Sequence, residues 1–511
     1  MVKKIKDIKI IKALPSLPVW LVMILMVVIF LRIPSLFYPY SYGDEGIYLT
    51  LGQAIRQGLT IYRDIHDNKP PMLYLLAAIS NSLFWFRVIL MVWNLGTIVV
   101  FWKLAQYFFK EKFLSIFSST FLFALLTTLP IFEGNIANAE VFMILPILAG
   151  LLLIFCGKKR EELRFLASGV LFSLAVLFKV PAGFDFFALG LFLLFFLSLK
   201  SWQVTVRQGL LLLAGFSLPL LLFSLYFMIK DAFLPFLQAG FLQNIGYLSS
   251  WKGKSQGMIF NTGFILRIFS LLALTVFLWL TRKKLDKNLI FLCLWLIFSL
   301  FGATLSERPY PHYLVQVLPP ASLLVGLFFS KIKNLERLLL LFFLCLFLIA
   351  YQHFHFWGYP TIAYYQNFFA WATKQKTNEE YLQYFNSNLP RNQQIASFLI
   401  HHTTADERIF IWGEDAPCLY ALSRRLPPGR YAANYHIKDF NGYQETLEAI
   451  TSVQPKYIVV LDQKDEFPQL ELILAKDYHP FSTLDGATLF FRKNFKVIES
   501  DSINRVRRDI I

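Results

Sequence analysis

Two adjacent carboxylates, Asp44 and Glu45, follow the first long apolar run of the 511-residue chain. Charged groups are costly at membrane depth, so an acid pair at the end of a span is either a feature of the membrane interface or a functional site. A carboxylate near apolar surface can have its pKa raised toward a value useful for proton transfer, with a sign that depends on its neighbours. Alternatively, Asp44 caps a helix that lies in the membrane interface. Adjacent side chains on a helix point in different directions, which predicts that the two acids have different roles.

Further polar residues follow at the ends of later apolar segments. The motif GLTIYRDIHDNKPPMLY places Lys69 where the chain returns to the membrane, and an ammonium group there can meet a phosphate or act as an interfacial anchor. Arg308, Tyr310 and His312 form another cluster before a span. Arg, Tyr and His can all donate hydrogen bonds to phosphate or sugar, but an aromatic belt with a snorkelling Arg is the alternative. Lys179 is a second candidate for phosphate binding or for simple anchoring.

The composition indicates a membrane protein with many spans. Hydrophobic residues make up 56% of the chain, Phe occurs 54 times, and the mean hydropathy is +0.52, with apolar runs too long for a soluble core. The net charge of +16 is divided into short Lys and Arg clusters between these runs. Anionic lipid headgroups and the positive-inside rule explain this pattern, so we expect membrane lipids and no nucleic acid as partners. The four cysteines have no metal-type spacing, and a structural disulfide is not expected.

The apolar runs predict a topology with the Lys-rich N-terminus in the cytoplasm, as a retained anchor. About eleven spans are expected, near residues 17–37, 86–108, 114–131, 141–156, 165–178, 184–199, 210–228, 264–280, 289–305, 313–329 and 338–356. Residues 70–85 are apolar but short, and their two leading prolines suit the first turn of a re-entrant or shallow helix. Counting this segment as a full span would invert every later turn, whereas omitting it places all strong basic turns on the cytoplasmic side.

The chain after residue 357 has soluble character and alternates between predicted helices and strands. We expect helices near residues 392–402, 419–425 and 444–451, and strands at 408–413, 456–462 and 487–493. The sequence therefore predicts a transmembrane domain at 1–357, with an outer loop at 38–70, followed by a small extracytoplasmic α/β domain at 358–511.

Four motifs together resemble the GT-C superfamily of membrane glycosyltransferases, in the branch that holds protein O-mannosyltransferases and bacterial aminoarabinose-lipid A transferases. These motifs are GDEG at 43–46, GLTIYRDIHDNKPP at 58–71, ANAEVF at 137–142, and ERPYPHYLVQVLPP at 307–320. The resemblance covers roughly residues 17–356 in order, and the α/β tail is similar to the outer domains of many bacterial members. It implies a polytopic α-helical membrane protein with the GT-C fold and about eleven to thirteen transmembrane helices. One position departs from the pattern, because the second acid is often Asp in the lipid A branch and is Glu140 here.

In that family the donor is a sugar on a polyprenyl phosphate, and transfer occurs at the outer leaflet. The resemblance implies that Asp44 is the general base for the acceptor hydroxyl and that Lys69 binds the leaving phosphate. A fixed cation stabilises the charge on a departing phosphate more in the transition state than in the ground state. Glu45 is then expected to orient the site or to pair with a local cation.

The expected site has three groups of residues. The catalytic group is Asp44, Glu45 and Glu140, the donor-phosphate group is Lys69, Arg308 and Lys179, and the substrate group is Tyr62, His66, Asp67, Tyr310 and His312. Glu140 is expected to hold the acceptor or to pair with a cation, whereas Glu133 in the same turn is expected to be a solvated acid. Lys252 and Lys254 are expected to cover the donor. The histidines in HFH and HH lack metal-ligand spacing, so no metal or cofactor is expected.

The predicted function is transfer of one sugar from a polyprenyl phosphate to a hydroxyl of a glycan, lipid or protein, by direct displacement at the outer face of the inner or plasma membrane. Two other interpretations remain open: a lipid-linked sugar flippase or transporter, and a scaffold that binds glycolipid without transfer. A transporter is expected to carry charges near the midplane on broken helices, with internal pseudo-symmetry. The informative charges here gather at one face, which favours the enzyme.

Overall fold

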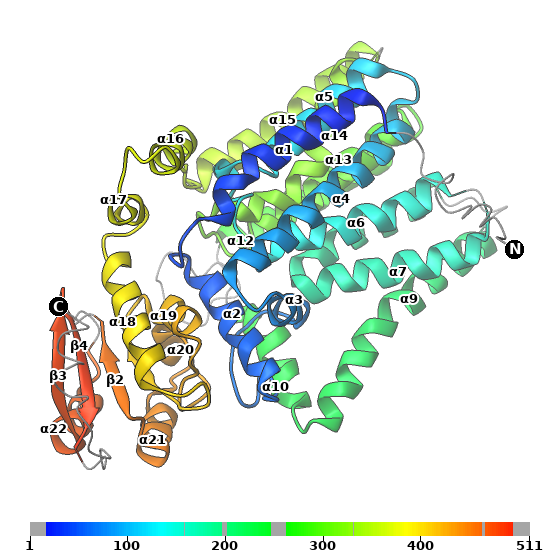
Figure 1. The fold of residues 1–511 in the computed structure, drawn as a ribbon. Helices are drawn as coiled ribbons and strands as arrows, with labels where there is room; N and C mark the ends of the chain where they lie inside the picture. The colour runs from blue at the N-terminus through cyan, green and yellow to red at the C-terminus, as the bar shows by residue number, and fades with distance from the viewer. Residues whose placement is uncertain are drawn as a thin grey trace, which may run out of the picture.

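The computed structural model describes residues 17–157, 159–196, 202–246, 262–330, 332–461 and 466–493. A helical bundle is joined to a small α/β domain (Figure 1). Within the described residues, seven helical segments are long and apolar enough to cross a membrane: α1 (Val19–Leu36), α4 (Leu83–Phe109), α6 (Ala139–Cys156), α9 (Trp202–Ile229), α12 (Thr262–Thr281), Pro311–Phe328 and α15 (Asn334–His353). Shorter apolar helices lie at α5 (Phe113–Leu126), Val180–Phe195 and α13 (Lys287–Ala303). The chain is therefore a multi-pass membrane protein.

Each of the expected spans contains a helix. The run near 165–178 is α7 (Glu161–Phe178), whose first turn is acidic. The segment Pro311–Phe328 combines a 3₁₀-helix, η5 (Pro311–Val317), with α14 (Leu318–Phe328), and Val180–Phe195 combines η3 (Val180–Ala182) with α8 (Gly183–Phe195). Phenylalanine rings fill much of the bundle interior. For example, the buried rings of Phe101 and Phe123 stack with their centroids 4.1 Å apart. Such offset pairs add stabilisation beyond the area that they bury.

Short helices connect the long ones at the end of the bundle near the α/β domain. They are α2 (Gly43–Arg56), α3 (Met72–Ser80), α10 (Phe233–Leu237), the π-helical η4 (Gln238–Leu242) and α11 (Gln243–Gly246). The nine residues of α3 rise about 14 Å at about 1.5 Å per residue, about half of a hydrocarbon layer. The helix ends at Asn81, which has a left-handed backbone (φ 58°), just before α4 begins. The prediction that this segment is too short to be a full span is confirmed.

The C-terminal domain contains a four-stranded sheet of order β1-β2-β4-β3, in which β1 and β2 are parallel and the other pairs are antiparallel. The strands are β1 (Phe410–Trp412), β2 (Tyr457–Val460), β3 (Tyr478–Leu484) and β4 (Ala487–Arg492). The helices are α16 (Thr361–Ala372), α17 (Asn378–Gln383), α18 (Leu389–His402), α19 (Ala416–Ser423), α20 (Asn434–Asp439), α21 (Tyr443–Val453) and α22 (Pro468–Asp477). Side chains of β1 alternate between two cores: Ile411 packs with α18 and α19, whereas Phe410 and Trp412 pack with α20, α21 and α22. Helices therefore cover both faces of the sheet.

Helix α2, which carries the acid pair, packs between α3 and α19 (Figure 1). A Cβ on Gly46 would lie 2.7 Å from the backbone of Pro417, and one on Gly52 would lie 2.6 Å from the backbone of Ala77. Every residue from 45 to 54 is buried. Helices α3 and α19 therefore enclose this stretch of α2, and its position relative to the membrane interface stays a prediction.

Candidate active site

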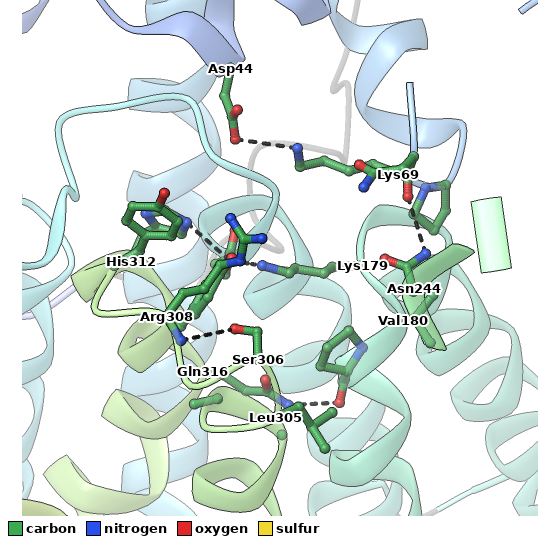
Figure 2. A pocket seen from close by; sticks show the side chains of 18 of the residues that line it. Asp44, Lys69, Lys179, Val180, Asn244, Leu305, Ser306, Arg308, His312 and Gln316 are labelled. Atoms are coloured by element: carbon green, nitrogen blue, oxygen red, sulfur yellow. Dashed lines mark hydrogen bonds and ion pairs between the residues drawn. The ribbon is translucent and has the colours of Figure 1, made fainter. Parts of the chain in front are cut away.

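A cavity of about 670 Å³ lies where the bundle meets the C-terminal domain. Seven of the predicted site residues line it: Asp44, Lys69, Glu140, Lys179, Arg308, Tyr310 and His312. Figure 2 shows Asp44 and Lys69 at one end of the cavity and Leu305 and Gln316 toward the other. The structure thus brings together charged residues from α2, from the loop before α3, from α6 and from the segments before α8 and η5.

Asp44 and Lys69 form an ion pair at the cavity end, with Oδ2 and Nζ 3.3 Å apart (Figure 2). The hydroxyl of Tyr48, one helical turn along α2, donates to the same carboxylate at 3.0 Å. Burial raises the pKa of this carboxyl group, but Lys69, His312 and the tyrosine hydrogen bond outweigh it and lower the pKa to about 2. The Asp44 side chain is therefore ionised at neutral pH.

Asp44 does not cap its helix. Helix α2 begins at Gly43, its N-cap position is Tyr42, and that position has no side-chain cap. The acid lies in the first turn and directs its carboxylate to Lys69. The alternative of a capping role is therefore wrong, and the carboxylate belongs to the cavity.

Glu45 does not line the cavity but forms a buried ion pair with Arg87 of α4. The Arg87 Nε donates to Glu45 Oε1 at 3.0 Å, and the backbone N–H of Ala137 donates to the same oxygen at 2.9 Å. Arg87 also donates to the carbonyl oxygens of Ser35 and Tyr38, at 2.8 and 2.9 Å. Glu45 thus joins α2 to the end of α1, to α4 and to the loop before α6, and its predicted pairing with a cation is confirmed.

Glu140 and Lys179 form a second acid–lysine pair in the cavity. His312 lies between two acids, with Nε2 3.6 Å from Glu140 Oε1 and Nδ1 against Glu133. The hydroxyl of Tyr42 donates to Glu133 at 2.9 Å. The prediction of a solvated Glu133 was wrong: the residue is only 3% exposed, because the start of α2 and the η5 segment cover it.

Aromatic rings surround the cations of the cavity. Arg308 and Lys179 extend into the same space in Figure 2. The Lys179 ammonium lies 4.0 Å from the ring centroid of Tyr313. Tyr310 stacks on His312 and meets Trp357 edge-on, with centroid distances of 5.7 and 5.0 Å. Cations beside rings suit a ligand that carries both a phosphate and a sugar, because the cations attract the anion and the rings pack on apolar sugar faces.

The other three candidates, Tyr62, His66 and Asp67, are buried behind Lys69 and are not part of the cavity wall. The Tyr62 hydroxyl donates to the carbonyl of Lys69 at 2.7 Å, and Asp67 accepts from the hydroxyl of Tyr74 at 2.8 Å. Tyr62 and Asp67 therefore hold the loop that carries Lys69, and none of the three lines the cavity in which contact with substrate was expected.

Some residues of the cavity wall were not predicted. Tyr435, His436 and Asp439 of α20 line the cavity, and no motif in their segment marks them. Asn244 of α11 also lines it and donates to the carbonyl of Asn68 at 3.1 Å. Lys252 and Lys254, expected to cover the donor, lie outside the described residues. In the part of the chain that the structure describes, no group of three or more His, Cys, Asp or Glu side chains is arranged to hold a metal ion.

Comparison with known proteins finds similar folds among solved structures. No protein-family model and no curated protein matches the chain. Among solved structures, ArnT from Cupriavidus metallidurans bound to undecaprenyl phosphate is similar with a TM-score of 0.54, at 14% identity, over 92% of this chain and 97% of that one. The apo structure of the same protein gives the same values. The apo oligosaccharyltransferase of Archaeoglobus fulgidus has a TM-score of 0.46 at 13% identity, over 86% of this chain and 69% of that one. The likeness to ArnT shows that this chain has the GT-C fold that its motifs predicted.

Proposed function

We propose that this protein is a membrane glycosyltransferase that moves one sugar from a polyprenyl phosphate to an acceptor hydroxyl at the outer face of the membrane. The observation that carries the proposal is a cavity in which an ionised acid, Asp44, lies among three cationic side chains, Lys69, Lys179 and Arg308. The ArnT structure, which has the same fold, is of a complex with undecaprenyl phosphate. The acceptor is a glycan, a lipid or a protein.

Binding of the donor changes the charge balance around Asp44. The donor phosphate is an anion, and Lys69 is shared between it and the carboxylate once both are present. Lys69 is the strongest of the influences that lower the pKa of Asp44, so sharing it with the phosphate raises that pKa from its value of about 2. A carboxylate with a higher pKa is a better proton acceptor, so donor binding prepares Asp44 for catalysis.

The transfer itself is a single displacement. The acceptor oxygen attacks the anomeric carbon, and a new C–O bond forms while the bond from that carbon to the phosphate oxygen breaks. The electron pair leaves with the phosphate, where the three cations stabilise it, and the acceptor proton passes to Asp44. One displacement inverts the configuration at the anomeric carbon.

A second polar cluster in the cavity, centred on Glu140, orients the reactants. Glu140 is held by Lys179 and by His312, whose other nitrogen is held by Glu133. Both partners contact the same carboxylate oxygen, Oε1, and the lone pairs that they do not occupy can accept hydrogen bonds from sugar hydroxyls. Glu140 is thus assigned to substrate positioning.

The test uses full-length protein in lipid nanodiscs with a panel of polyprenyl-phosphate sugars and a crude membrane extract as acceptor. Release of free polyprenyl phosphate is measured for the wild type, Asp44→Asn and Lys69→Ala. The exposed residues Lys476 and Asp477 on α22 provide matched controls, as Lys476→Ala and Asp477→Asn. Donor-dependent release that is lost in the two site variants and kept in the two controls supports the transferase. Absence of release from every donor contradicts it and favours a transporter or a binding scaffold.

We also propose that the N-terminus is cytoplasmic and that residues 358–511 form an extracytoplasmic domain. The basic turns of the sequence support this orientation. A cysteine introduced in place of the exposed Lys476, in a variant whose native cysteines are replaced, is expected to react with a membrane-impermeant maleimide added to whole cells. Reaction only after cell lysis contradicts the orientation.

A further inference from the structure

The C-terminal domain reaches the candidate site through one short helix. Tyr435, His436 and Asp439 of α20 line the same cavity as Asp44 and Lys69. In Figure 1, α19 and α20 lie between the sheet and α2, so the domain meets the bundle at the cavity. The site is therefore built from both halves of the chain.

His436 of α20 makes a polar contact with the loop that carries Lys69. Its Nε2 lies 3.5 Å from Oδ1 of Asp67, and the two residues are 4% and 0% exposed. Burial lowers the pKa of His436, with Asp67 acting in the opposite direction, so the ring is neutral at neutral pH. A carboxylate only accepts hydrogen bonds, so its charge favours the tautomer that carries the proton on Nε2.

Asp67 connects His436 to the backbone of Lys69 through further hydrogen bonds. The Asp67 carboxylate accepts the hydroxyl of Tyr74 at 2.8 Å and the backbone N–H of Asn68 at 2.8 Å. The oxygen of Tyr74 in turn accepts the backbone N–H of Lys69 at 3.1 Å. A continuous path of polar contacts therefore runs from His436 to the backbone of Lys69.

A second set of contacts fixes the same loop to the domain. The backbone N–H of His66 donates to the carbonyl of Arg430 at 2.8 Å. The His66 ring meets Tyr431, Phe440 and His436 edge-on, with centroid distances of 5.4, 4.7 and 5.6 Å. These contacts leave the loop little freedom to move relative to α20.

We propose that His436 is a positioning residue of the candidate site: through Asp67 and Tyr74 it sets the direction of Lys69, so that the C-terminal domain completes the phosphate-binding end of the cavity. The inference rests on the proposed function, in which Lys69 binds the donor phosphate. It assigns a role to the C-terminal domain that neither the motifs nor the fold assigns.

The experiment measures binding of undecaprenyl phosphate to full-length protein in nanodiscs. His436→Leu fills the same space without an N–H group, whereas His436→Gln keeps an N–H donor near the Nε2 position. We expect His436→Leu to weaken binding by about 10-fold and His436→Gln to restore most of it, because the polar contact with the Asp67 carboxylate is lost in the first and kept in the second. His479→Leu, an exposed histidine of β3 in the same domain, is the matched control and is expected to bind as the wild type does.

The path through Asp67 gives a second, independent readout. Asp67→Asn removes the charge that faces His436, and the double variant Asp67→Asn with His436→Leu is expected to bind no more weakly than Asp67→Asn alone, since both changes break one path. If the losses of affinity in the two single variants add up in the double variant, His436 does not act through Asp67 and the proposal is overturned. Equal weakening of binding by His436→Leu and His436→Gln would show that His436 acts by packing instead. If His436→Leu does not fold, unchanged affinity in folded Asp67→Asn overturns the proposal. Failure of the wild type to bind undecaprenyl phosphate contradicts the proposed function itself, and with it this inference.

Discussion

The Asp44 carboxylate lies 3.3 Å from the Lys69 ammonium, although Asp44 belongs to α2 and Lys69 to the loop before α3. Each residue is held by its own side of the cavity: Asp44 by the hydroxyl of Tyr48, and the backbone of Lys69 by Tyr62 and Tyr74. The two charges therefore meet as a fixed pair, and a donor phosphate must enter beside a carboxylate.

Replacing Lys69 with Met keeps the side-chain length and removes the charge. The strongest influence that lowers the pKa of Asp44 is then gone, so this pKa is expected to rise above the wild-type value of about 2. In the wild type this folded-state pKa is below the usual 3.8, so the pair stabilises the fold above that pH and its contribution is lost as the pH falls through about 2. The pH profile of residual donor turnover should show its acidic limb at higher pH in Lys69→Met. An acidic limb at the wild-type position would contradict the assignment of Asp44 as the base.

The buried pair of Glu45 and Arg87 is expected to act on stability. Glu45→Leu or Arg87→Leu alone leaves one charge buried without its partner, at a cost of about 3–5 kcal/mol. The double variant removes both charges and should recover much of the loss. Thermal unfolding of the three variants in nanodiscs measures this. Two stable single variants with abolished donor turnover would instead indicate a direct catalytic role for Glu45.

Glu133 is expected to matter for turnover through His312. In Glu133→Gln the charged acceptor for the histidine is lost, and hydrogen bonds to charged groups contribute about 1.5–3 kcal/mol, so turnover should fall by about 10- to 150-fold. Glu111→Gln, an exposed acid in the turn between α4 and α5, is the control. Equal donor turnover in Glu133→Gln and Glu111→Gln would mean that Glu133 contributes to packing and not to turnover.

The close approaches of α2 predict a steep cost for added methyl groups. In Gly46→Ala the new Cβ would lie 2.7 Å from the backbone of Pro417, so α19 must shift, and overpacking of this kind costs about 1–3 kcal/mol. Limited proteolysis should cut the variant between the bundle and the C-terminal domain more quickly than the wild type. Gly96→Ala in α4, where no atom lies within 4 Å of the added Cβ, is the matched control. Identical proteolysis of both variants would contradict the tight docking of α2 and α19.

The membrane helices and the short α3 could be predicted because span length and apolar composition are local properties of the sequence. The acid pair and Lys69 could also be found, since a charge at the end of an apolar run is conspicuous. Arg87 is also a charged residue within an apolar run, at 86–108, and the structure shows that it forms an ion pair with Glu45.

Other features depend on contacts between distant segments. Glu133 became buried because η5 and the start of α2 close over it, and His436 entered the site because α20 docks on the loop at 62–69. Strand β3 was missed because Pro480 interrupts its pattern, although the Asp485-Gly486 turn, with both φ angles positive, marks the hairpin to β4. No local pattern reports the contacts that bury Glu133 or that bring His436 to the site.

The contacts from the loop at 62–69 to α20 also limit how chimeras of this protein can be built. A C-terminal domain taken from another protein would bring its own residue to the place of His436, opposite the Asp67 of this chain. The histidine and the aspartate would then come from different parents, and the Lys69 loop would lose the surface against which it is aligned. A working exchange must transfer residues 62–74 together with the domain, so the boundary at which the two halves can be recombined is not the point where the bundle ends.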